Sequence, residues 1–572
     1  MKRVSLLFMS MLLPILASAY DVKVNGIYYN LNASTKTATV TNNSDEYYSG
    51  AVTIPSTIQP GGVTYQVTTI GRRAFLGCDK LKSVKIPNSV TSIEAFAFLG
   101  CNLLTSVTIP GSVKTFGESV FEVCDDLNKV VFEQGVTTIG SNMFKQCSSL
   151  TSVTLPNTLK TIDYNAFWNC SGLQSITIPE GVTEIGCDAF KGCDLRSVTI
   201  PSSVGKVEEY AFSNCENLQT VTINGVNPII SAETFYKCSS IETVSLDCQT
   251  IGNWFAGQLK LKTVVLGSHV KTISEGAFKG CSDLSNLTIG NNVAVIGKEA
   301  FSGCYNLPKV VIPNSVTTIG EKAFEGCSLI YFNIGTGVTS IGAGAFNCGE
   351  YSFSYNGSNT SILPSLINSS LYWVSLGDNV NEIPDNLFKD CTHLENAILG
   401  NGITKIGNHA FDGCIELKDI IIPNRVTSIG DYAFDGCLNL DMVTIGRGVS
   451  SIGASAFYCC FDLKTVYCYA TQVPSTDASA FGYILEEDNH SQLSNVTLYV
   501  PASSSSAYAN CAPWKYFGTI NQIMDGIATE IHETPSQDQS QRDVWYTLDG
   551  RKVNGKPTKR GVYIHNGKTV VN

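Results

Sequence analysis

The twenty-one cysteines are the residues of this 572-residue sequence with the widest range of possible chemistry, because thiolates bind metals, attack electrophiles and form disulfides. Most follow a regular spacing of about 23 residues, which would place them at the same point of successive turns with their side chains parallel. We therefore expect these cysteines to be reduced thiols that pack in a core. The sixteen periodic cysteines are Cys78, Cys101, Cys124, Cys147, Cys170, Cys193, Cys215, Cys238, Cys281, Cys304, Cys327, Cys348, Cys391, Cys414, Cys437 and Cys460. The better disulfide candidates, with no pairing assigned, are Cys187, Cys248, Cys459, Cys468 and Cys511.

The residue pattern does not support metal binding or catalysis. A tetrahedral metal site needs closely spaced Cys or His pairs such as C-x-x-C, and the repeats contain none. Adjacent carboxylates such as Glu208-Glu209 and Glu486-Glu487 are typical of a solvated face. The six histidines stand at scattered positions without a nucleophile motif, and they are His269, His393, His409, His490, His532 and His565. We expect no catalytic residue, no metal and no cofactor, and hence a protein that is not an enzyme.

The elements that carry the cysteines follow the pattern A-F-x-G-C-x-x-L-x-x-V-x-I-P, after which a Val and an Ile stand three residues apart. Val84 and Ile86 alternate around Lys85, which is strand periodicity and points both apolar residues inward. Proline follows the strand in seven turns, where it suits the end of a strand ladder, at Pro87, Pro110, Pro156, Pro179, Pro201, Pro313 and Pro423. The pattern predicts one solenoid turn per repeat, with strands stacked parallel and in register and with little helix.

Two intervals between periodic cysteines are longer than one repeat. Cys238 to Cys281 and Cys348 to Cys391 each span 43 residues, which equals one turn of 20 plus one of 23. On this interpretation Gln258 and Asn368 occupy the cysteine position of the shortened turns. We expect the stack to run through both intervals.

The full motif, A-F-x-G-C-x-x-L-x-x-V-x-I-P-x-S-V-x-x-I-G, resembles the bacterial surface leucine-rich repeat of BspA-like adhesins and treponemal repeat proteins. The resemblance covers residues 70–501 and implies a leucine-rich-repeat solenoid that adheres to extracellular-matrix protein or to other cells. Residues 20–69 alternate apolar and polar side chains and resemble the β-rich N-terminal cap of that family. Residues 502–530, with Trp514, Tyr516 and Phe517, resemble its closing cap.

The two ends of the chain have the character of export segments. Residues 1–19 are predicted to be a signal peptide, with basic Lys2 and Arg3, a following apolar run and a small-residue cleavage site. Residues 531–542 are predicted to be a polar linker. Residues 543–572 are similar to C-terminal tails of secreted Bacteroidetes-type proteins, including type IX sorting domains, which implies outer-membrane passage or surface attachment. The alternative is a small β-domain with no sorting role.

Charge and hydropathy narrow the list of partners. The net charge of -11 does not suit a nucleic-acid binder, which needs clustered Lys and Arg. No later stretch has the ~18 or more consecutive apolar residues of a transmembrane span. We expect a secreted or cell-surface protein whose partner is an extracellular protein or, alternatively, a glycan.

The outward strand positions indicate where a partner would bind. Ser and Thr dominate the early turns, as strand propensity on a solvated sheet favours, so we interpret those turns as scaffold. Each strand has two outward positions, and the second lies between its two inward residues, as Lys85 lies between Val84 and Ile86. In later turns this second outward position is mainly apolar, and the candidate ligand-binding residues are Val311, Ile398, Ile421, Thr444 and Tyr467. The outward aromatics Tyr331 and Tyr467 do not form a continuous platform, so we rank a protein partner above a glycan.

Overall fold

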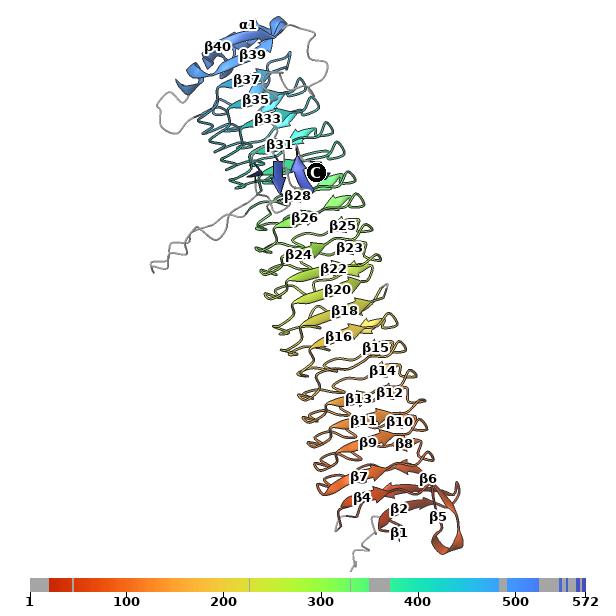
Figure 1. Ribbon diagram of the computed structural model, residues 1–572. Helices are drawn as coiled ribbons and strands as arrows, with labels where there is room; N and C mark the ends of the chain where they lie inside the picture. The colour runs from red at the N-terminus through yellow and green to blue at the C-terminus, as the bar shows by residue number, and fades with distance from the viewer. Residues whose placement is uncertain are drawn as a thin grey trace, which may run out of the picture. The chain divides into compact units, whose positions relative to one another are not determined.

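The computed structural model describes residues 20–43, 46–225, 227–329, 331–348, 371–482 and 491–523, together with four strands between 545 and 571. The chain divides into two compact units. Unit 1 comprises the residues up to Arg196 with Ser203–Cys215, and unit 2 comprises Ser197–Ser202 with the residues from Glu216 onward. Each unit stacks parallel strands from successive turns (Figure 1). The predicted parallel solenoid of about 23 residues per turn is confirmed.

Unit 1 begins with a mixed sheet. Its first strands pair antiparallel, and the third joins parallel to a strand that continues into the first repeat turns. The strands of this sheet are β1 (Val22–Val24), β2 (Ile27–Asn32), β3 (Thr37–Thr41), β5 (Thr57–Ile58), β6 (Tyr65–Ile70), β8 (Ser92–Ile93) and β10 (Thr115–Phe116), and the 3-10 turn η1 (Pro60–Gly62) precedes β6. The remaining strands pair parallel, and they are β4 (Gly50–Thr53), β7 (Leu81–Lys85), β9 (Ser106–Ile109), β11 (Lys129–Phe132), β13 (Ser152–Thr154), β12 (Thr138–Ile139), β14 (Thr161–Ile162), β15 (Glu184–Ile185) and β17 (Lys206–Val207).

Unit 2 carries longer strands on one side of its turns and two-residue strands on the other. The longer strands are β16 (Ser197–Ile200), β18 (Thr220–Asn224), β20 (Thr243–Asp247), β22 (Thr263–Leu266), β24 (Asn286–Thr288), β26 (Lys309–Val311), β28 (Tyr331–Asn333), β30 (Trp373–Ser375), β31 (Asn396–Ile398), β33 (Asp419–Ile422), β35 (Met442–Ile445), β37 (Thr465–Cys468), β39 (Thr497–Pro501) and β40 (Thr519–Ile523). The short strands are β19 (Ile229–Ile230), β21 (Thr250–Ile251), β23 (Thr272–Ile273), β25 (Val295–Ile296), β27 (Thr318–Ile319), β29 (Ser340–Ile341), β32 (Lys405–Ile406), β34 (Ser428–Ile429), β36 (Ser451–Ile452) and β38 (Ser475–Thr476).

A repeated set of apolar side chains forms the core of each turn. In the turn around Cys101, the side chains of Phe98, Leu104, Val107 and Ile109 are 3% exposed or less. The intervening Ser and Thr of the strand are exposed, so the predicted alternation is confirmed. Turns lie so close together that a Cβ at Gly117 would stand 2.1 Å from the backbone nitrogen of Ala95, which explains the glycine after the last Ile of a repeat.

One phenylalanine per turn forms a continuous stack within each unit. Ring centroids of adjacent turns are 4.7 to 6.2 Å apart, a separation that favours ring contact. Unit 1 stacks Phe75, Phe98, Phe121, Phe144, Phe167, Phe190 and Phe212. Unit 2 stacks Phe235, Phe255, Phe278, Phe301, Phe324, Phe346, Phe388, Phe411, Phe434, Phe457 and Phe481.

Periodic cysteines beside this stack are buried hydrogen-bond donors. Cys101 Sγ donates to the carbonyl of Phe75 at 3.2 Å, and the same contact recurs at 3.0 to 3.3 Å in most other turns. Burial raises the pKa of Cys170, Cys193 and Cys437 well above that of a free thiol, which keeps these donors protonated. The prediction of reduced core thiols is confirmed for most of the ladder. Gln258 replaces the thiol as predicted, because its Nε2 donates to the carbonyl of Phe235 at 3.3 Å.

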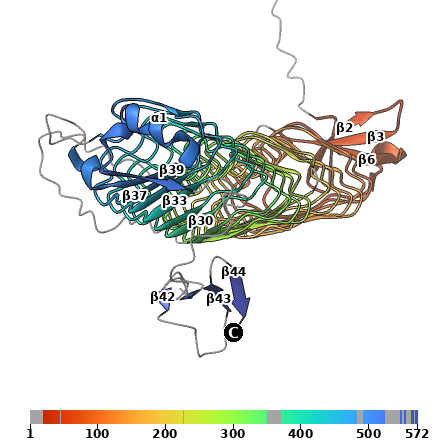
Figure 2. The same cartoon turned by 90° about the horizontal axis from the view of Figure 1, so that it is seen from above.

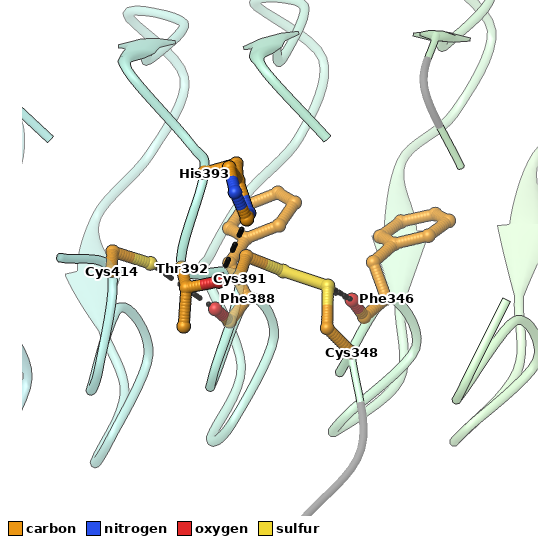
Figure 3. Close-up of a disulfide and its surroundings, with 7 residues drawn as sticks. All are labelled: Phe346, Cys348, Phe388, Cys391, Thr392, His393 and Cys414. Atoms are coloured by element: carbon orange, nitrogen blue, oxygen red, sulfur yellow. Dashed lines mark hydrogen bonds between the residues drawn. A yellow bond between two sulfur atoms is a disulfide. The ribbon is translucent and has the colours of Figure 1, made fainter. Parts of the chain in front are cut away.

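One disulfide joins two periodic cysteines, which corrects the sequence interpretation. Cys348 and Cys391 are bonded, with Cα atoms 5.3 Å apart, in adjacent turns of unit 2 (Figure 3). The disulfide candidates outside the ladder were wrong, because they are thiols, and they are Cys187, Cys248, Cys459, Cys468 and Cys511. Cys348 and Cys391, by contrast, face each other across one stacking interval.

The interval between Cys348 and Cys391 contains one turn and an insertion, which also corrects the sequence interpretation. The ring of Phe346 stacks on that of Phe388, with centroids 6.1 Å apart, and the amide of Cys348 donates to the carbonyl of Lys389. The two turns are thus direct neighbours, so no separate 20-residue turn stands between them. Asn368, the predicted cysteine equivalent, lies outside the described residues.

Aromatic side chains close unit 2 after its last turn. Trp514 and Phe517 pack edge-on against Phe481, with centroids 5.5 and 5.4 Å away, whereas Tyr516 is 41% exposed. α1 (Ser505–Asn510) lies beside β39 at this end (Figure 2), and it is the one α-helix among the described residues. The accompanying 3-10 turns are η3 (Ser491–Asn495), η4 (Ala502–Ser504) and η5 (Trp514–Tyr516).

The C-terminal tail contains a small antiparallel sheet. Its strands are β41 (Trp545–Thr547), β42 (Lys552–Val553), β43 (Val562–His565) and β44 (Lys568–Val571), in the order β42-β41-β43-β44. The predicted signal peptide and polar linker lie outside the described residues. Across the part of the chain that the structure describes, no helix is both long and apolar enough to cross a membrane.

Candidate functional site

Four of the five predicted ligand-binding residues lie on neighbouring strands of one sheet. This sheet has the order β30-β31-β33-β35-β37-β39-β40 in unit 2. Ile398, Ile421, Thr444 and Tyr467 occupy β31, β33, β35 and β37 at the second outward position. Val311 lies on β26, which pairs with β28 in a separate two-stranded sheet. The structure therefore does not bring Val311 together with the other four.

Strand register aligns the four residues and adds a fifth. Ile421 stands opposite Thr444, Thr444 opposite Tyr467, and Tyr467 opposite Tyr499 of β39. We call the row Ile398, Ile421, Thr444, Tyr467 and Tyr499 the strand-face column. The sequence interpretation missed Tyr499, because it placed residues 498–501 at the end of the array and did not compare them with the outward positions of the earlier strands. The apolar-x-apolar-Pro signature of that segment is the signal that would have identified it as one more repeat strand.

The column differs in accessibility along its length. Ile398 is 52% exposed and Ile421 is half-buried, whereas Thr444 is only 9% exposed because its neighbours flank it on both sides. Val311, outside the column, is 47% exposed. Ile398 thus offers a partner the largest exposed fraction in the column, and Thr444 contributes little.

Tyr467 and Tyr499 stack on each other. Their ring centroids are 4.6 Å apart with planes 17° from parallel, and burial together with the neighbouring Tyr499 and Tyr469 raises the pKa of Tyr467. Each ring covers one face of the other, so the pair presents edges and hydroxyl groups more than open faces. A sugar ring binds best on an open aromatic face, so this arrangement suits a polypeptide better than a glycan.

Two ion pairs and further apolar side chains surround the column. Glu395 pairs with Lys418 and Asp441 with Lys464, each at 3.3 Å, along the edge where the strands begin. In these same turns, the residue directly after the periodic cysteine is also apolar. These residues are Ile415, Leu438 and Phe461. Ile415 and Phe461 are 37% and 42% exposed. The late turns of unit 2 therefore expose Ile415 and Phe461 in addition to the strand-face column.

Each histidine whose surroundings the structure describes lies beside a polar side chain. His269 Nδ1 lies 2.9 Å from Asp247 Oδ2 on the surface, and His393 Nδ1 lies 3.1 Å from the hydroxyl of Thr392 (Figure 3). Within the described ranges, no three His, Cys, Asp or Glu side chains gather closely enough to hold a metal ion. The buried thiols are protonated donors, which is the opposite of what a nucleophile needs.

The repeats match a known protein family over most of the chain. The profile of the BspA type Leucine rich repeat region (6 copies) matches residues 57–174, 160–285, 271–366 and 365–486. A search of curated proteins found no match.

Solved structures with a similar repeat come from several bacteria. A leucine-rich repeat protein from Bacteroides ovatus is 24% identical over 81% of this chain and 100% of its own, with a TM-score of 0.41. A leucine rich cell surface protein from Faecalibacterium prausnitzii is 23% identical over 78% of this chain and 93% of its own, with a TM-score of 0.28. A leucine-rich repeat protein of T. pallidum is 22% identical over 50% of this chain and 91% of its own, with a TM-score of 0.20. At these TM-scores, family membership rests on the repeat profile alone.

Proposed function

Because the chain belongs to the family of BspA-type leucine-rich-repeat proteins, we propose that it is a secreted or surface-exposed, adhesin-like binding protein. Its partner is an extracellular protein of a matrix or a cell surface. The partner contacts the strand-face column of unit 2, where Ile398 and Ile421 supply apolar surface and Tyr467 and Tyr499 supply hydroxyl-bearing edges. Solenoids of this kind offer long regular sheets on which such contacts can be arranged.

The single observation that supports this site best is the exposed apolar surface of the column. The inward neighbours of Ile421, which are Ile420 and Ile422, already fill the core, so Ile421 adds nothing to it. Covering exposed apolar surface contributes about 25 cal/mol per Å² to binding. A row of such residues on a solvated sheet is therefore better explained by a partner than by folding.

Replacing the accessible residues of the column is expected to weaken partner binding. The triple variant Ile398→Thr, Ile421→Thr and Tyr467→Ser should raise the Kd for its partner at least tenfold, which corresponds to about 1.4 kcal/mol. Thermal stability should change little, because these side chains point away from the core. A panel of immobilised extracellular-matrix proteins, read by surface plasmon resonance, measures the effect.

Hydroxyl positions of the scaffold turns provide the matched control. Thr154→Ala, Thr177→Ala and Thr222→Ala together should leave the Kd unchanged, and Val311→Thr alone should have a smaller effect than the triple variant. Equal loss of affinity from both sets would contradict a localised site. The alternative function is glycan capture, and a glycan array probed with the same protein would reveal it if sugars bound and matrix proteins did not.

We also propose that the tail directs the protein to the cell surface. The residues that motivate this are the basic pair Lys559-Arg560 and the strand β43 that follows. Deleting residues 544–572 is expected to leave the melting temperature of the solenoid within about 2 °C of the full chain, because the tail has its own sheet. Surface labelling of cells should then fall at least fivefold. Unchanged surface display of the truncated chain would contradict the sorting role.

A further inference from the structure

The residue directly after most of the stacked phenylalanines is at least partly exposed, and these positions form a second row, here called the turn-face column. In unit 1, three successive members are Glu122, Lys145 and Trp168. Lys145 Nζ lies 3.2 Å from Glu122 Oε1 and 5.0 Å from the centroid of the Trp168 ring. The chain thus holds an amine between a carboxylate of the preceding turn and an aromatic ring of the following turn, the pairing that stabilises organic cations.

In unit 2, the same column reads Lys389, Asp412, Asp435 and Tyr458. Asp412 is satisfied, because its Oδ2 lies 3.5 Å from Lys389 Nζ and 2.9 Å from His409 Nδ1. Asp435, the next member, forms no ion pair with a Lys, Arg or His of the described residues. A carboxylate therefore stands where unit 1 places its own amine.

Tyr458 provides the aromatic neighbour of this carboxylate. Its ring leans over Gly482 of the next turn, where a Cβ would stand 2.9 Å from the ring carbon Cδ2. The turn of Asp435 packs directly against that of Tyr458, because the amide of Gly436 donates to the carbonyl of Tyr458. Burial and the neighbouring Asp412 raise the pKa of Asp435 to about 6, while the amide of Gly436 and the side chains of His409 and Lys389 oppose the rise. The carboxylate is partly desolvated, which strengthens its attraction for a cation.

We propose that Asp435 and Tyr458 bind the ammonium or guanidinium group of a Lys or Arg side chain from a polypeptide partner, in the arrangement that unit 1 builds internally with Lys145. The partner is taken from the proposed protein-binding function, but the contact is separate from the strand-face column. An organic cation fits better than a metal ion, because an aromatic face is not a metal ligand. Residues 371–482 contain thirteen Asp and Glu but six Lys and Arg, and this excess of negative charge attracts a basic segment.

Titration of the full chain with an acetylated hexalysine peptide at pH 7.5 tests the proposal by calorimetry. Asp435→Asn and Tyr458→Ala are each expected to weaken peptide binding at least fivefold. Asp462→Asn, which removes the same charge from an exposed site outside the column, should change it less than twofold. Absence of hexalysine binding to the wild type, or equal weakening by Asp462→Asn, would overturn the proposal.

A second variant tests the equivalence of the turn-face column in the two units through its melting temperature as well as through peptide binding. Asp435→Lys should place an amine between Asp412 and Tyr458, as Lys145 stands between Glu122 and Trp168. We expect this variant to lose hexalysine binding and to melt at a higher temperature than the wild type. A lower melting temperature would show that the two columns are not equivalent and would overturn the proposal.

Acidification gives an independent readout, because protonation of Asp435 removes its charge. Wild-type affinity for hexalysine should fall several-fold more between pH 7.5 and pH 5 than the affinity of Asp435→Asn. The strand-face triple variant should retain wild-type hexalysine affinity. Loss of matrix-protein binding with hexalysine binding retained would therefore refute only the strand-face site, and the reverse result would refute only the cation site.

Discussion

Replacing Phe301 with alanine is expected to destabilise unit 2 by about 3 to 5 kcal/mol, the range for removing a buried phenylalanine. Phe301 is fully buried, and its ring stacks between Phe278 and Phe324 with centroids 5.3 and 5.2 Å away. Its carbonyl also accepts the Cys327 thiol at 3.2 Å. The vacated space cannot collapse easily, because the backbones of the flanking turns are fixed by their own ladders. Urea unfolding followed by circular dichroism measures the loss.

Tyr305→Ala is the matched control for Phe301→Ala. Tyr305 belongs to the same turn but is 50% exposed, so its removal should cost less than about 0.5 kcal/mol. Because each turn contacts only its neighbours, hydrogen exchange in the Phe301→Ala variant should be fastest in the turns beside residue 301 and slower farther along the stack. Equal costs for the two substitutions would contradict the view that the phenylalanine stack is the main source of cohesion between turns.

Reduction of the Cys348–Cys391 disulfide is expected to have the second largest effect on the stability of unit 2. The bond closes a loop with a sequence separation of 43 residues, for which the chain-entropy estimate is about 4 kcal/mol. It also joins the two turns that flank the insertion. A reducing agent should therefore lower the denaturation midpoint of unit 2, and Cys348→Ala should lower it without further response to the reducing agent.

Thiol counting in denaturant provides the chemical check on this disulfide. Nineteen thiols are expected before reduction and twenty-one after it. Cys187→Ala is the control, because Cys187 is a thiol outside the ladder, and the variant should keep the wild-type response to reduction. Twenty-one thiols without any reducing agent, or a midpoint insensitive to reduction, would contradict the disulfide.

Much of the fold is predictable because each repeat has the same pattern of apolar residues and therefore makes the same contacts. The alternation of Val84, Lys85 and Ile86 already specifies which side chains point inward. The period of 23 residues specifies that every such set meets an identical set one turn away. Even the exception at Gln258 follows, because the amide nitrogen reaches the same carbonyl that the thiols reach.

The candidate site was predictable only in part, because exposure and contact depend on neighbours that the repeat pattern does not name. From sequence position alone, Val311, Thr444 and Ile398 are equally good candidates for ligand-binding residues. Pairing of β26 with β28 separates Val311 from the rest, and the side chains on the adjacent strands bury Thr444. Tyr499 joins the column through the register of β39 with β37, across 32 residues of sequence.

The solenoid, the inward and outward faces of its strands and the burial of most periodic thiols are predictable from the residue pattern, because they depend on contacts that recur at one fixed spacing. The pairing of Cys348 with Cys391 and the single turn in their interval become apparent only in three dimensions. A spacing of 43 residues is compatible with two turns or with one turn and an insertion. The choice is made by the stacking of Phe346 on Phe388, a contact between residues whose separation matches no repeat.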